Sequence, residues 1–360
     1  MAIPVFQSAN FEYSGETRYD DLKYIRLSNT PNHVALHDKL SALEGGEAAL
    51  VTASGMAAIS TALLTVLSSG DHLLAQACLY GGTHDLITGD LPALGISHDF
   101  IDGDDPASWA RLLKPTTKAI YVETMTNPLL QVADLQAVVA FAREHGLVSL
   151  IDNTLASPVN FQPLSTGFDL SLHSATKYLN GHSDIVAGAV IGSSAFVTRI
   201  TRRLNHLGGC LDPHAAFLLH RGMKTLAVRV HRQNASAQRI AEFLFHHPAV
   251  ASVNYPGLAS HPTHSRAAGL FSGFGGVLSL ELGGGVDAAE RLIRRVTLFL
   301  SAPSLGGVES LITRPATTSH AGMSVPDRRR LGIFDGLVRI SVGIEGPEDL
   351  VADLAQALEG

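Results

Sequence analysis

Short apolar runs alternate with helix-like segments through the first half of the chain. Five segments have apolar positions at helical spacing and are predicted to be helices: residues 34–44, 57–67, 86–94, 108–113 and 135–145. Five nearly continuous apolar runs show the pattern of strands that are buried on both faces: residues 48–51, 72–75, 118–122, 147–151 and 185–191. This alternation predicts an α/β domain in which a mostly parallel sheet is flanked by helices.

The pattern changes after residue 194, where a long helical region runs through residues 229–247. Strand-like runs follow at residues 250–254, 277–281 and 337–342, and the last periodic segment, 348–358, predicts a helix. Strands and helices in this order favour a second, smaller domain of the α+β class.

These patterns divide the chain into three parts. Residues 1–26 have no periodic pattern and are expected to form an N-terminal arm, which needs another surface to order it. Residues 27–226 hold the predicted α/β domain, and residues 227–360 the smaller α+β domain. The length of 360 residues agrees with two packed domains, because single cores stop growing near ~250–300 residues.

Composition and charge narrow the functional class. Hydrophobic residues make up 46% of the chain and charged residues 16%, the balance of a compact globular protein. The net charge of −7 offers no basic field to nucleic acid or to an anionic membrane, so we expect a small-molecule substrate instead. No signal-like N-terminus, no apolar run of ~18 residues and no Cys-x-x-Cys motif is present, which predicts a cytoplasmic protein.

The 17 histidines prompt a search for a metal site. No His-Glu-x-x-His motif or comparable cluster is present, so no metal is expected. His33 with His37, and the pair His246-His247, are interpreted as solvated helix positions.

Lys177 is the candidate for covalent chemistry. It alone of the six lysines lies among small hydroxyl residues directly after a strand-like run, in Ser174-Ala175-Thr176-Lys177-Tyr178. A lysine that forms an imine must lose its charge, which burial and a nearby cation favour, while Ser174 and Thr176 can bind a phosphate. A surface turn is the commoner explanation of an isolated lysine, and the motifs described next argue against it.

Asp152 ends a predicted buried strand, in Ile151-Asp152-Asn153-Thr154. Ligands of open α/β sheets bind beyond the carboxyl ends of the strands, so Asp152 is expected to face the binding crevice. A protonated pyridine nitrogen would give this carboxylate a cationic partner. The alternative is an aspartate that caps the following helix.

Two further turns between a strand and a helix are candidate cofactor contacts. Ser54, Gly55 and Met56 open the helix predicted at 57–67, whose free N–H groups suit a phosphate, although an ordinary serine cap explains them equally. Tyr80 precedes two glycines and could stack on a planar cofactor or belong to the core. No nucleotide-binding glycine motif is present.

Arg339 lies inside an apolar strand, in Leu337-Val338-Arg339-Ile340-Ser341. A buried guanidinium needs an anion, and the α-carboxylate of an amino acid would bind it with two parallel hydrogen bonds. A structural salt bridge is the alternative.

Eight segments, in one order along nearly the whole chain, resemble the trans-sulfuration family of Cys/Met-metabolism enzymes that depend on pyridoxal phosphate (PLP). The matching segments are Tyr24-Ile25-Arg26, Ser54 to Ala58, Leu79 to Thr83, Glu123 to Pro128, Ile151 to Thr154, Ser174 to Tyr178 with Gly181 to Asp184, Ser304 to Ser310, and Arg339 to Gly343. The family includes cystathionine γ-lyase, γ-synthase and β-lyase and methionine γ-lyase. The resemblance implies the fold-type I architecture of PLP-dependent enzymes.

The resemblance also implies a role for each matching residue. Lys177 would bind PLP as an imine and move protons, Asp152 would pair with the ring nitrogen, and Tyr80 would stack on the ring. The phosphate of PLP would be bound by Ser54, Gly55, Met56, Ser174 and Thr176. The phosphate in a neighbouring subunit would be bound by Tyr24 and Arg26. The substrate carboxylate would be bound by Arg339, Ser304 and Asn127. Members of the family are homotetramers built from two active dimers.

The chain departs from the family pattern at several positions. The segment from Tyr24 to Asn32 lacks the usual Tyr-Ser-Arg and Gly-Asn-Pro, which puts the path of this loop in question. Gly82 stands where methionine γ-lyases have a cysteine, and Pro303 where many γ-synthases and γ-lyases have a glutamate.

The expected activity is γ-elimination or γ-replacement on cystathionine or an activated homoserine. Cystathionine β-lyase is the main alternative, because β-elimination needs the same lysine, aspartate and arginine. Methionine γ-lyase is less favoured. A cofactor-free binding protein on the same fold would have no reason to keep Lys177 and Asp152.

Overall fold

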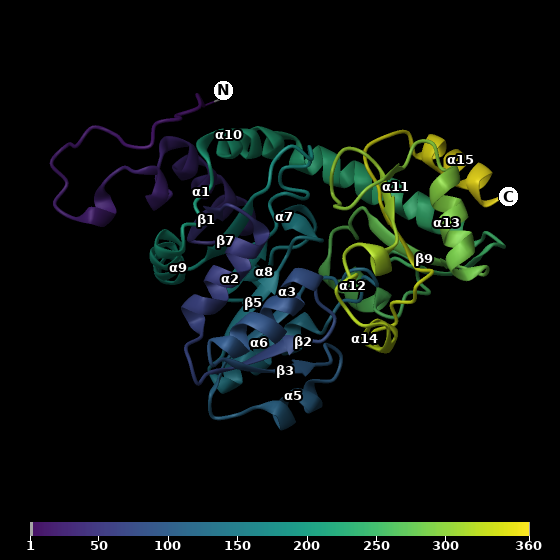
Figure 1. The fold of residues 1–360 in the computed structure, drawn as a ribbon, viewed down its shortest axis with the longest axis horizontal. Coiled ribbons are helices and arrows are strands. Elements are labelled where there is room, and N and C mark those ends of the chain that lie inside the picture. Colours follow the sequence, from purple (N-terminus) through teal and green to yellow (C-terminus); the bar gives the residue numbers. More distant parts are fainter. Residues whose placement is uncertain (1–2, 360) are drawn as a thin grey trace.

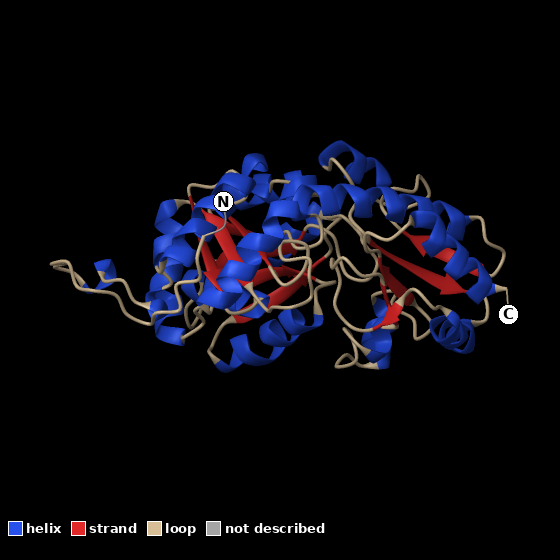
Figure 2. Ribbon diagram, turned by 90° about the horizontal axis from the view of Figure 1, so that it is seen from above, coloured by secondary structure: helices blue, strands red, loops and turns tan. Residues whose placement is uncertain are grey.

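Two β-sheets flanked by helices form the two halves of the molecule (Figures 1 and 2). The computed structural model describes residues 3–359. Among these residues, no helix combines the length and apolar character needed to cross a membrane.

The larger sheet has seven strands in the order β1-β7-β6-β5-β4-β2-β3. In chain order they are β1 (Ala48–Thr52), β2 (His72–Gln76), β3 (Ser97–Ile101), β4 (Thr117–Glu123), β5 (Val148–Asp152), β6 (Leu170–His173) and β7 (Gly188–Gly192). Strands β3, β2, β4, β5 and β6 are parallel, whereas β7 is antiparallel to both of its neighbours, β1 and β6. The predicted mostly parallel sheet is therefore confirmed.

Helices cover both faces of this sheet. They are α1 (Pro31–Glu44), α2 (Gly55–Val66), α3 (Gly81–Asp85), α4 (Leu91–Ala93), α5 (Pro106–Leu112), α6 (Leu135–His145), α7 (Ser157–Asn160), α8 (Pro163–Thr166), α9 (Ser194–Leu207) and α10 (Pro213–Gly222). Alternate strand residues face opposite sides: Ile120 and Val122 pack with α1 and α6, whereas Ala119 and Tyr121 pack with α2 and α9. Burial on both faces explains why these strands are continuous apolar runs.

The second half is built on a five-stranded sheet in the order β10-β11-β12-β9-β8. Its elements are α11 (Leu226–Phe245), β8 (Val250–Asn254), α12 (His264–Leu270), β9 (Val277–Leu282), α13 (Gly285–Arg295), β10 (Leu300–Ser301), β11 (Leu311–Thr313), α14 (Val325–Arg330), β12 (Val338–Ser341) and α15 (Pro347–Leu358). Helices α11, α13 and α15 pack together (Figure 1). The domain limits at residues 26 and 226 stay a prediction.

Four strands are absent from the sequence-based prediction: β3, β6, β10 and β11. Strand β3 lies at the edge of its sheet and has the polar sequence Ser-His-Asp-Phe-Ile, so it lacks an apolar run. The other three have two to four residues. The segment predicted at 185–191 begins three residues later, at Gly188. The helical region predicted from about residue 194 to residue 247 is divided into α9, α10 and α11.

In the described part of the N-terminal arm, residues 3–26, the helical structure is limited to short 3-10 turns, Tyr19–Asp21 and Ile25–Leu27, in agreement with its unpatterned sequence. At the base of the arm, two contacts join its two ends: the backbone N–H of Ile25 donates to the carbonyl of Ala9 (2.8 Å), and Asn10 forms a β-bridge with Tyr24. The loop between projects away from the rest of the molecule (Figure 1). Tyr13 at its tip is 66% exposed.

Candidate active site

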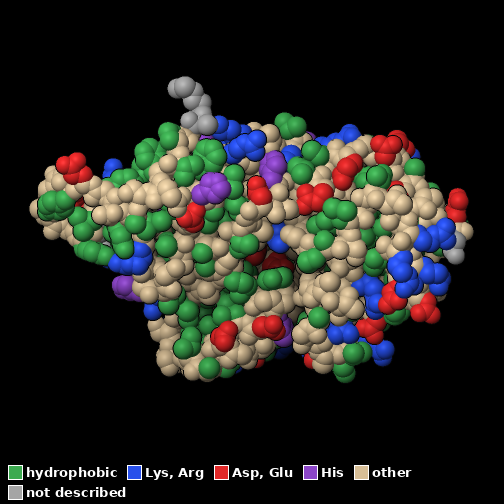
Figure 3. Space-filling view, turned by 45° about the horizontal axis from the view of Figure 1, so that its top comes forward, with side chains coloured by type: hydrophobic (Ala, Val, Ile, Leu, Met, Phe, Trp, Pro, Cys, Tyr) green, Lys and Arg blue, Asp and Glu red, His purple; other side chains and the backbone are tan. Residues whose placement is uncertain are grey.

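A cavity of about 680 Å³ lies beyond the carboxyl ends of the parallel strands and reaches residues of the second half. It is lined by residues that the sequence predicts for the site: Ser54, Gly55, Met56, Tyr80, Asn127, Asp152, Ser174, Thr176, Lys177, Ser304 and Arg339. Figure 3 shows the surface hollowed between the two halves, with charged side chains inside the hollow. The structure therefore brings together all the predicted site residues except Tyr24 and Arg26.

Lys177 lies in a tight turn that leaves β6, and its side chain is half-buried in the cavity wall. Its Nζ donates a hydrogen bond to Oγ of Ser304 (2.8 Å). Burial and the charge of Arg339 lower the pKa of Lys177 from 10.5 to about 8. A surface turn is thus excluded, and the amine is neutral in a useful fraction of molecules near neutral pH.

Asp152 is the last residue of β5, and its half-buried carboxylate lines the same cavity. Its Oδ1 accepts a hydrogen bond from the N–H of Thr154 (2.9 Å). Burial raises the pKa of Asp152, while the bonds from Thr154 and the charge of His173 act in the opposite direction. The next helix, α7, starts after Ala156 with no side-chain cap, so Asp152 is not a helix cap.

Helix α2 directs its N-terminus at the cavity. The Oγ of Ser54 accepts a hydrogen bond from the N–H of Ala57 (3.0 Å), as the serine-cap interpretation expects. A Cβ atom at Gly55 would lie 2.8 Å from the Cβ of Ser174, so only glycine lets α2 approach the lysine turn this closely. The N-terminus of α2 can therefore have a serine cap and also bind a phosphate.

Tyr80 stands at the mouth of the cavity with 44% of its surface exposed, so it is not a core aromatic. Its N–H donates to Oε1 of Glu123 (2.7 Å). Glu123 is buried at the end of β4, opposite Asp152 in the strand register, and burial followed by the charge of Asp152 raises the pKa of Glu123. The sequence analysis gave Glu123 no role, although its position at a strand end next to that of Asp152 could have identified it.

Arg339 on β12 is 4% exposed and faces the cavity from the second half. Its Nη2 donates to the carbonyl of Ser304 (2.7 Å) and its Nη1 to Oδ1 of Asn127 (3.4 Å), while its Nε is buried without a hydrogen-bond partner among the described residues. Burial lowers the pKa of Arg339 to about 10. Among residues 3–359 no carboxylate forms an ion pair with it, which argues against a structural salt bridge.

Ser304, which contacts both Lys177 and Arg339, has a backbone φ angle of +87°. This left-handed backbone conformation is strained for a residue other than glycine, and such strain is typical of ligand-binding positions. It places the Oγ of Ser304 toward Lys177 and its carbonyl toward Arg339.

Tyr24 and Arg26 lie outside the cavity. The Nη1 of Arg26 donates to the carbonyl of Asn205 on α9 (3.1 Å), and its guanidinium lies over the rings of Tyr19 and Tyr24 at 5.9 and 5.6 Å. Their implied contact with a neighbouring subunit's cofactor stays a prediction.

Arg229 on α11 is a buried residue that the sequence analysis missed. Its Nη1 donates to the carbonyl of Tyr178 (2.8 Å), and its Nη2 donates to that of Gly222 (3.0 Å). Burial lowers the pKa of Arg229 to about 10. Because Tyr178 follows Lys177, this guanidinium fixes the end of the lysine turn. No short motif signals such a contact between residues 51 positions apart.

The histidine interpretation needs one correction. His33 is fully buried, with Nδ1 2.7 Å from Oγ1 of Thr30 and Nε2 2.8 Å from the carbonyl of Leu211, and His37 has a buried Nε2. Neither is a solvated position, because α1 turns this face toward the core and α10. Within the described part of the chain, no group of three or more His, Cys, Asp or Glu side chains could hold a metal.

The residues present fit a phosphorylated pyridine aldehyde. The cavity offers a glycine-lined helix start for a phosphate, an amine of lowered pKa for covalent attachment, and a carboxylate for a ring nitrogen. This α/β fold and this cavity define a class of enzymes that hold such a cofactor through a lysine.

Comparison with known proteins identifies the family. A family model for the Cys/Met metabolism PLP-dependent enzymes matches residues 1–359. Cystathionine β-lyase MetC of Bacillus subtilis is 43% identical over 360 residues, covering 100% of this chain and 92% of the relative. Cystathionine γ-lyase of the same organism is 42% identical over 360 residues, covering 100% and 94%.

A solved structure of cystathionine γ-synthase from Xanthomonas oryzae pv. oryzae, in complex with aminoacrylate and cysteine, superposes with a TM-score of 0.96. It is 40% identical, and the match covers 99% of this chain and 92% of that one. The chain therefore belongs to the Cys/Met metabolism PLP-dependent family. It is a trans-sulfuration enzyme of fold-type I that uses PLP, which excludes a cofactor-free binding protein.

Proposed function

We propose that the enzyme catalyses γ-elimination or γ-replacement on cystathionine or an activated homoserine. The observation that carries the proposal is the contact of Ser304 with both Lys177 and Arg339, which links an amine to a carboxylate-binding guanidinium. An α-amino acid whose carboxylate binds Arg339 would present its α-carbon to Lys177.

Arg339 would bind the substrate carboxylate. Its buried Nε lacks a partner among the described residues, and a carboxylate beside the guanidinium would satisfy this donor. Asn127, which is 6% exposed, holds Nη1 from the other side and would restrict the guanidinium to one orientation. The unpaired donor thus supports an anionic ligand better than a purely structural arginine does.

Lys177 would move the protons. A base works best when its pKa lies close to the operating pH, and burial together with Arg339 brings that of Lys177 to about 8. Its Nζ would take the proton from the substrate α-carbon and then shift a proton at the β-carbon. Four methylene groups give the amine the reach for both carbons.

The remaining cavity residues would hold the cofactor. PLP, when bound, supplies an electron sink for the charge that develops at the α-carbon. Asp152 would keep the ring nitrogen protonated and Tyr80 would cover one face of the ring. Ser54, Gly55, Met56, Ser174 and Thr176 would bind the phosphate.

Gly82, which stands where methionine γ-lyases have a cysteine, argues against methionine γ-lyase activity. A Cβ atom at this position would lie 2.8 Å from Cε1 of Tyr80 and 3.2 Å from Sδ of Met56, so a larger residue would displace the ring of Tyr80. Pro303, which lines the cavity without a charge, is a feature shared with plant γ-synthases. Asn180-Gly181-His182-Ser183-Asp184 supports γ-chemistry by its resemblance to γ-lyases and bacterial γ-synthases.

Cystathionine β-elimination is the second candidate, and the similarity to the Bacillus subtilis β-lyase favours it. The purified enzyme is given cystathionine, and both keto acids are measured. We expect 2-oxobutanoate from γ-elimination, with a Lys177→Ala variant as the control for background hydrolysis. Pyruvate as the main product would refute the proposal and establish β-elimination.

We further propose that the chain assembles as a homotetramer of two active dimers in the cytoplasm. The support is the N-terminal arm, on which the large side chains of Tyr13, Tyr19 and Tyr24 are exposed. In the assembly, Tyr24 and Arg26 would contact the phosphate in the neighbouring subunit. Mass measurement of the holoenzyme in solution tests the assembly.

A further inference from the structure

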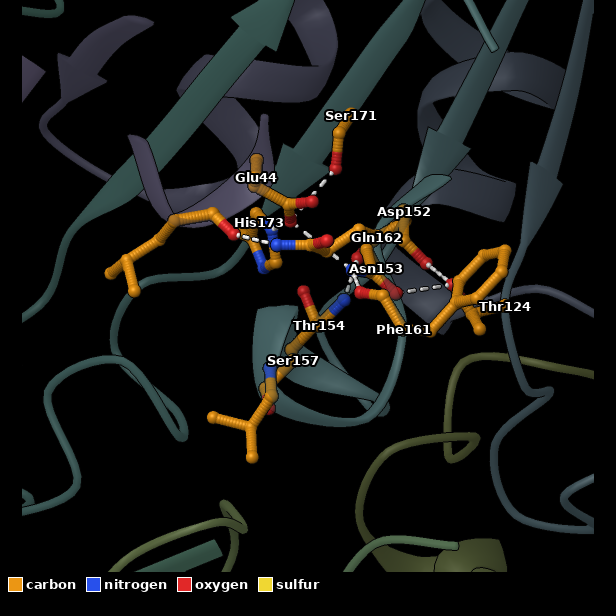
Figure 4. A network of polar contacts seen from close by, with 12 residues as sticks. Glu44, Thr124, Asp152, Asn153, Thr154, Ser157, Phe161, Gln162, Ser171 and His173 are labelled. Carbon is orange, nitrogen blue, oxygen red and sulfur yellow. Dashed lines mark hydrogen bonds and ion pairs between the residues drawn. The ribbon is translucent and has the colours of Figure 1, made fainter. Parts of the chain in front are cut away.

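A buried pair of ionisable side chains lies near Asp152 (Figure 4), and neither of the two lines the cavity. Glu44, the last residue of α1, is 0% exposed, and His173, the last residue of β6, is 2% exposed. The Nε2 of His173 and Oε1 of Glu44 are in direct contact. None of the roles described above uses this pair.

The position of Glu44 is unfavourable for a carboxylate. It is buried, it lies at the negative end of the dipole of α1, and its Oε2 has no partner among the described residues. Three donors converge on its other oxygen: Nε2 of His173, Oγ of Ser171 (3.1 Å) and Nδ2 of Asn153 (3.1 Å). Three hydrogen bonds to one oxygen hold the side chain of Glu44 in one orientation against His173.

The pair is connected to Asp152 through the backbone and through Asn153. Every side-chain polar atom of Asn153 is bonded: Nδ2 donates to Glu44 and to the carbonyl of Phe161, and Oδ1 accepts from Oγ1 of Thr124 (2.8 Å). Its N–H donates to the carbonyl of Leu172 (2.8 Å), the residue before His173. The network therefore holds the backbone next to Asp152 in one position, and the side chain of Asp152 projects from this backbone.

We propose that Glu44, acting through His173 and Asn153, is a positioning residue that keeps the Asp152 carboxylate ionised and aimed into the cofactor cavity. The inference rests on the proposed pairing of Asp152 with the ring nitrogen of PLP. Burial raises the pKa of Asp152, and the charge of His173 is one of the effects that lower it. Without Glu44, His173 would lose the side chain that holds its ring in place, and its effect on Asp152 would weaken.

Other ionisable groups also surround Asp152. They are Glu123 and Tyr121 on β4, and Lys177 and Arg339 across the cavity. All four stay in place when Glu44 is changed, so a shift in the titration of Asp152 would report on the pair alone.

The test measures the affinity of apoenzyme for added PLP as a function of pH. In Glu44→Gln the carboxylate of Asp152 becomes protonated at higher pH, so the acid limb of the affinity profile should move to higher pH. Thermal unfolding of the apoenzyme is measured in parallel. Asp38→Asn, an exposed charge change on the same helix, is the matched control and should leave the profile in place.

Ser171→Ala separates an electrostatic role from a structural one. It removes one hydrogen bond to Glu44 and keeps the charge pair, so it should lower the unfolding temperature without moving the acid limb. If Glu44→Gln does not fold, Glu44→Gln combined with His173→Asn, a neutral amide pair, is measured for the same shift.

Two results would overturn the inference. An unmoved acid limb in the folded variant would show that the pair does not act on Asp152, and an equal shift in Ser171→Ala would show that the pair is only structural. Asp152→Asn distinguishes this failure from that of the proposed function. If Asp152→Asn itself binds PLP and turns over like the wild type, the role of Asp152 is wrong, and the inference fails with it.

Discussion

The lysine turn and the N-terminal arm carry the two parts of the predicted site, and they differ in what holds them. The turn is fixed by its own chain: the N–H of Ser174 donates to Oγ1 of Thr154 (2.7 Å) and that of Gly181 to the carbonyl of Lys177 (2.7 Å). The start of the arm bonds to Asn32 and Asp212, and Ile25 bonds back to Ala9, whereas the loop between them exposes Tyr13 and Tyr19. Residues on the turn are therefore ready for chemistry in one chain, whereas those on the arm are expected to need another surface.

The largest expected effect in this comparison is that of Lys177→Ala. We expect loss of turnover by several orders of magnitude, because the variant lacks both the attachment point and the base. The visible absorption band of the lysine-linked cofactor should disappear. The far-ultraviolet circular dichroism should stay unchanged, since the side chain is half-buried and makes one hydrogen bond. Wild-type turnover by the purified variant would remove Lys177 from the mechanism.

Arg229→Met tests whether the turn depends on a buried charge from the second half. The change removes the Arg229 donor from the carbonyl of Tyr178 and one of the two side-chain donors from that of Gly222, so the free energy of unfolding should fall by about 3 kcal/mol. Arg239→Met on the same helix, which breaks only an exposed ion pair with Glu348, is the control and should change little. Equal denaturant midpoints for both variants would show that Arg229 does not support the turn.

The sequence predicts those strands and helices whose apolar residues form a regular pattern along the chain. Strands β2, β4 and β5 are buried on both faces, so their apolar runs predict them. Strand β6 precedes the lysine motif but has only four residues, too few for a separate strand to be assigned from the sequence. Its polar positions, Ser171 and His173, contact Glu44 instead of adding to an apolar run.

The same distinction applies to the site. Lys177, Asp152 and Gly55 lie at the ends of strands or at the start of a helix, where order along the chain predicts a common location. Glu44 and Arg229 could not be predicted, because their partners are distant in sequence: Asn153 lies 109 positions after Glu44. Contacts of this kind depend on how helices pack on the sheet.

A smaller effect is expected from pH on the rate at which PLP attaches to the apoenzyme. Attachment of PLP to the apoenzyme needs the neutral amine, so the attachment rate should rise with pH and level off above about 8, the pKa of Lys177. Because Arg339 lowers this pKa, Arg339→Met should move the midpoint to higher pH. Stopped-flow absorbance at several pH values measures both. A midpoint near 10.5 in the wild type would show that the turn does not tune its lysine.

The arm gives the smallest single effect and the sharpest test of the difference between the two regions. Within residues 3–359, the guanidinium of Arg26 donates to the carbonyl of Asn205 and to the hydroxyl of Tyr19, and it forms no ion pair with a carboxylate. Arg26→Ala should weaken PLP affinity, since loss of a charge-assisted phosphate contact costs about 1.5–3 kcal/mol. The fold should be unaffected. Lys23→Ala, on the same arm, is the control.

The defect should lie between subunits. Mixed dimers of Lys177→Ala and Arg26→Ala chains would hold one site with an intact lysine from one chain and an intact arginine from the other. Activity at limiting PLP should therefore exceed that of either parent variant, measured after exchange of subunits and isolation of the mixed species. An arm that serves only its own chain gives no such gain, because each lysine then shares its chain with the altered arginine. Absence of rescue in intact mixed dimers would thus assign the arm to its own subunit, and the two regions would no longer differ in what they depend on.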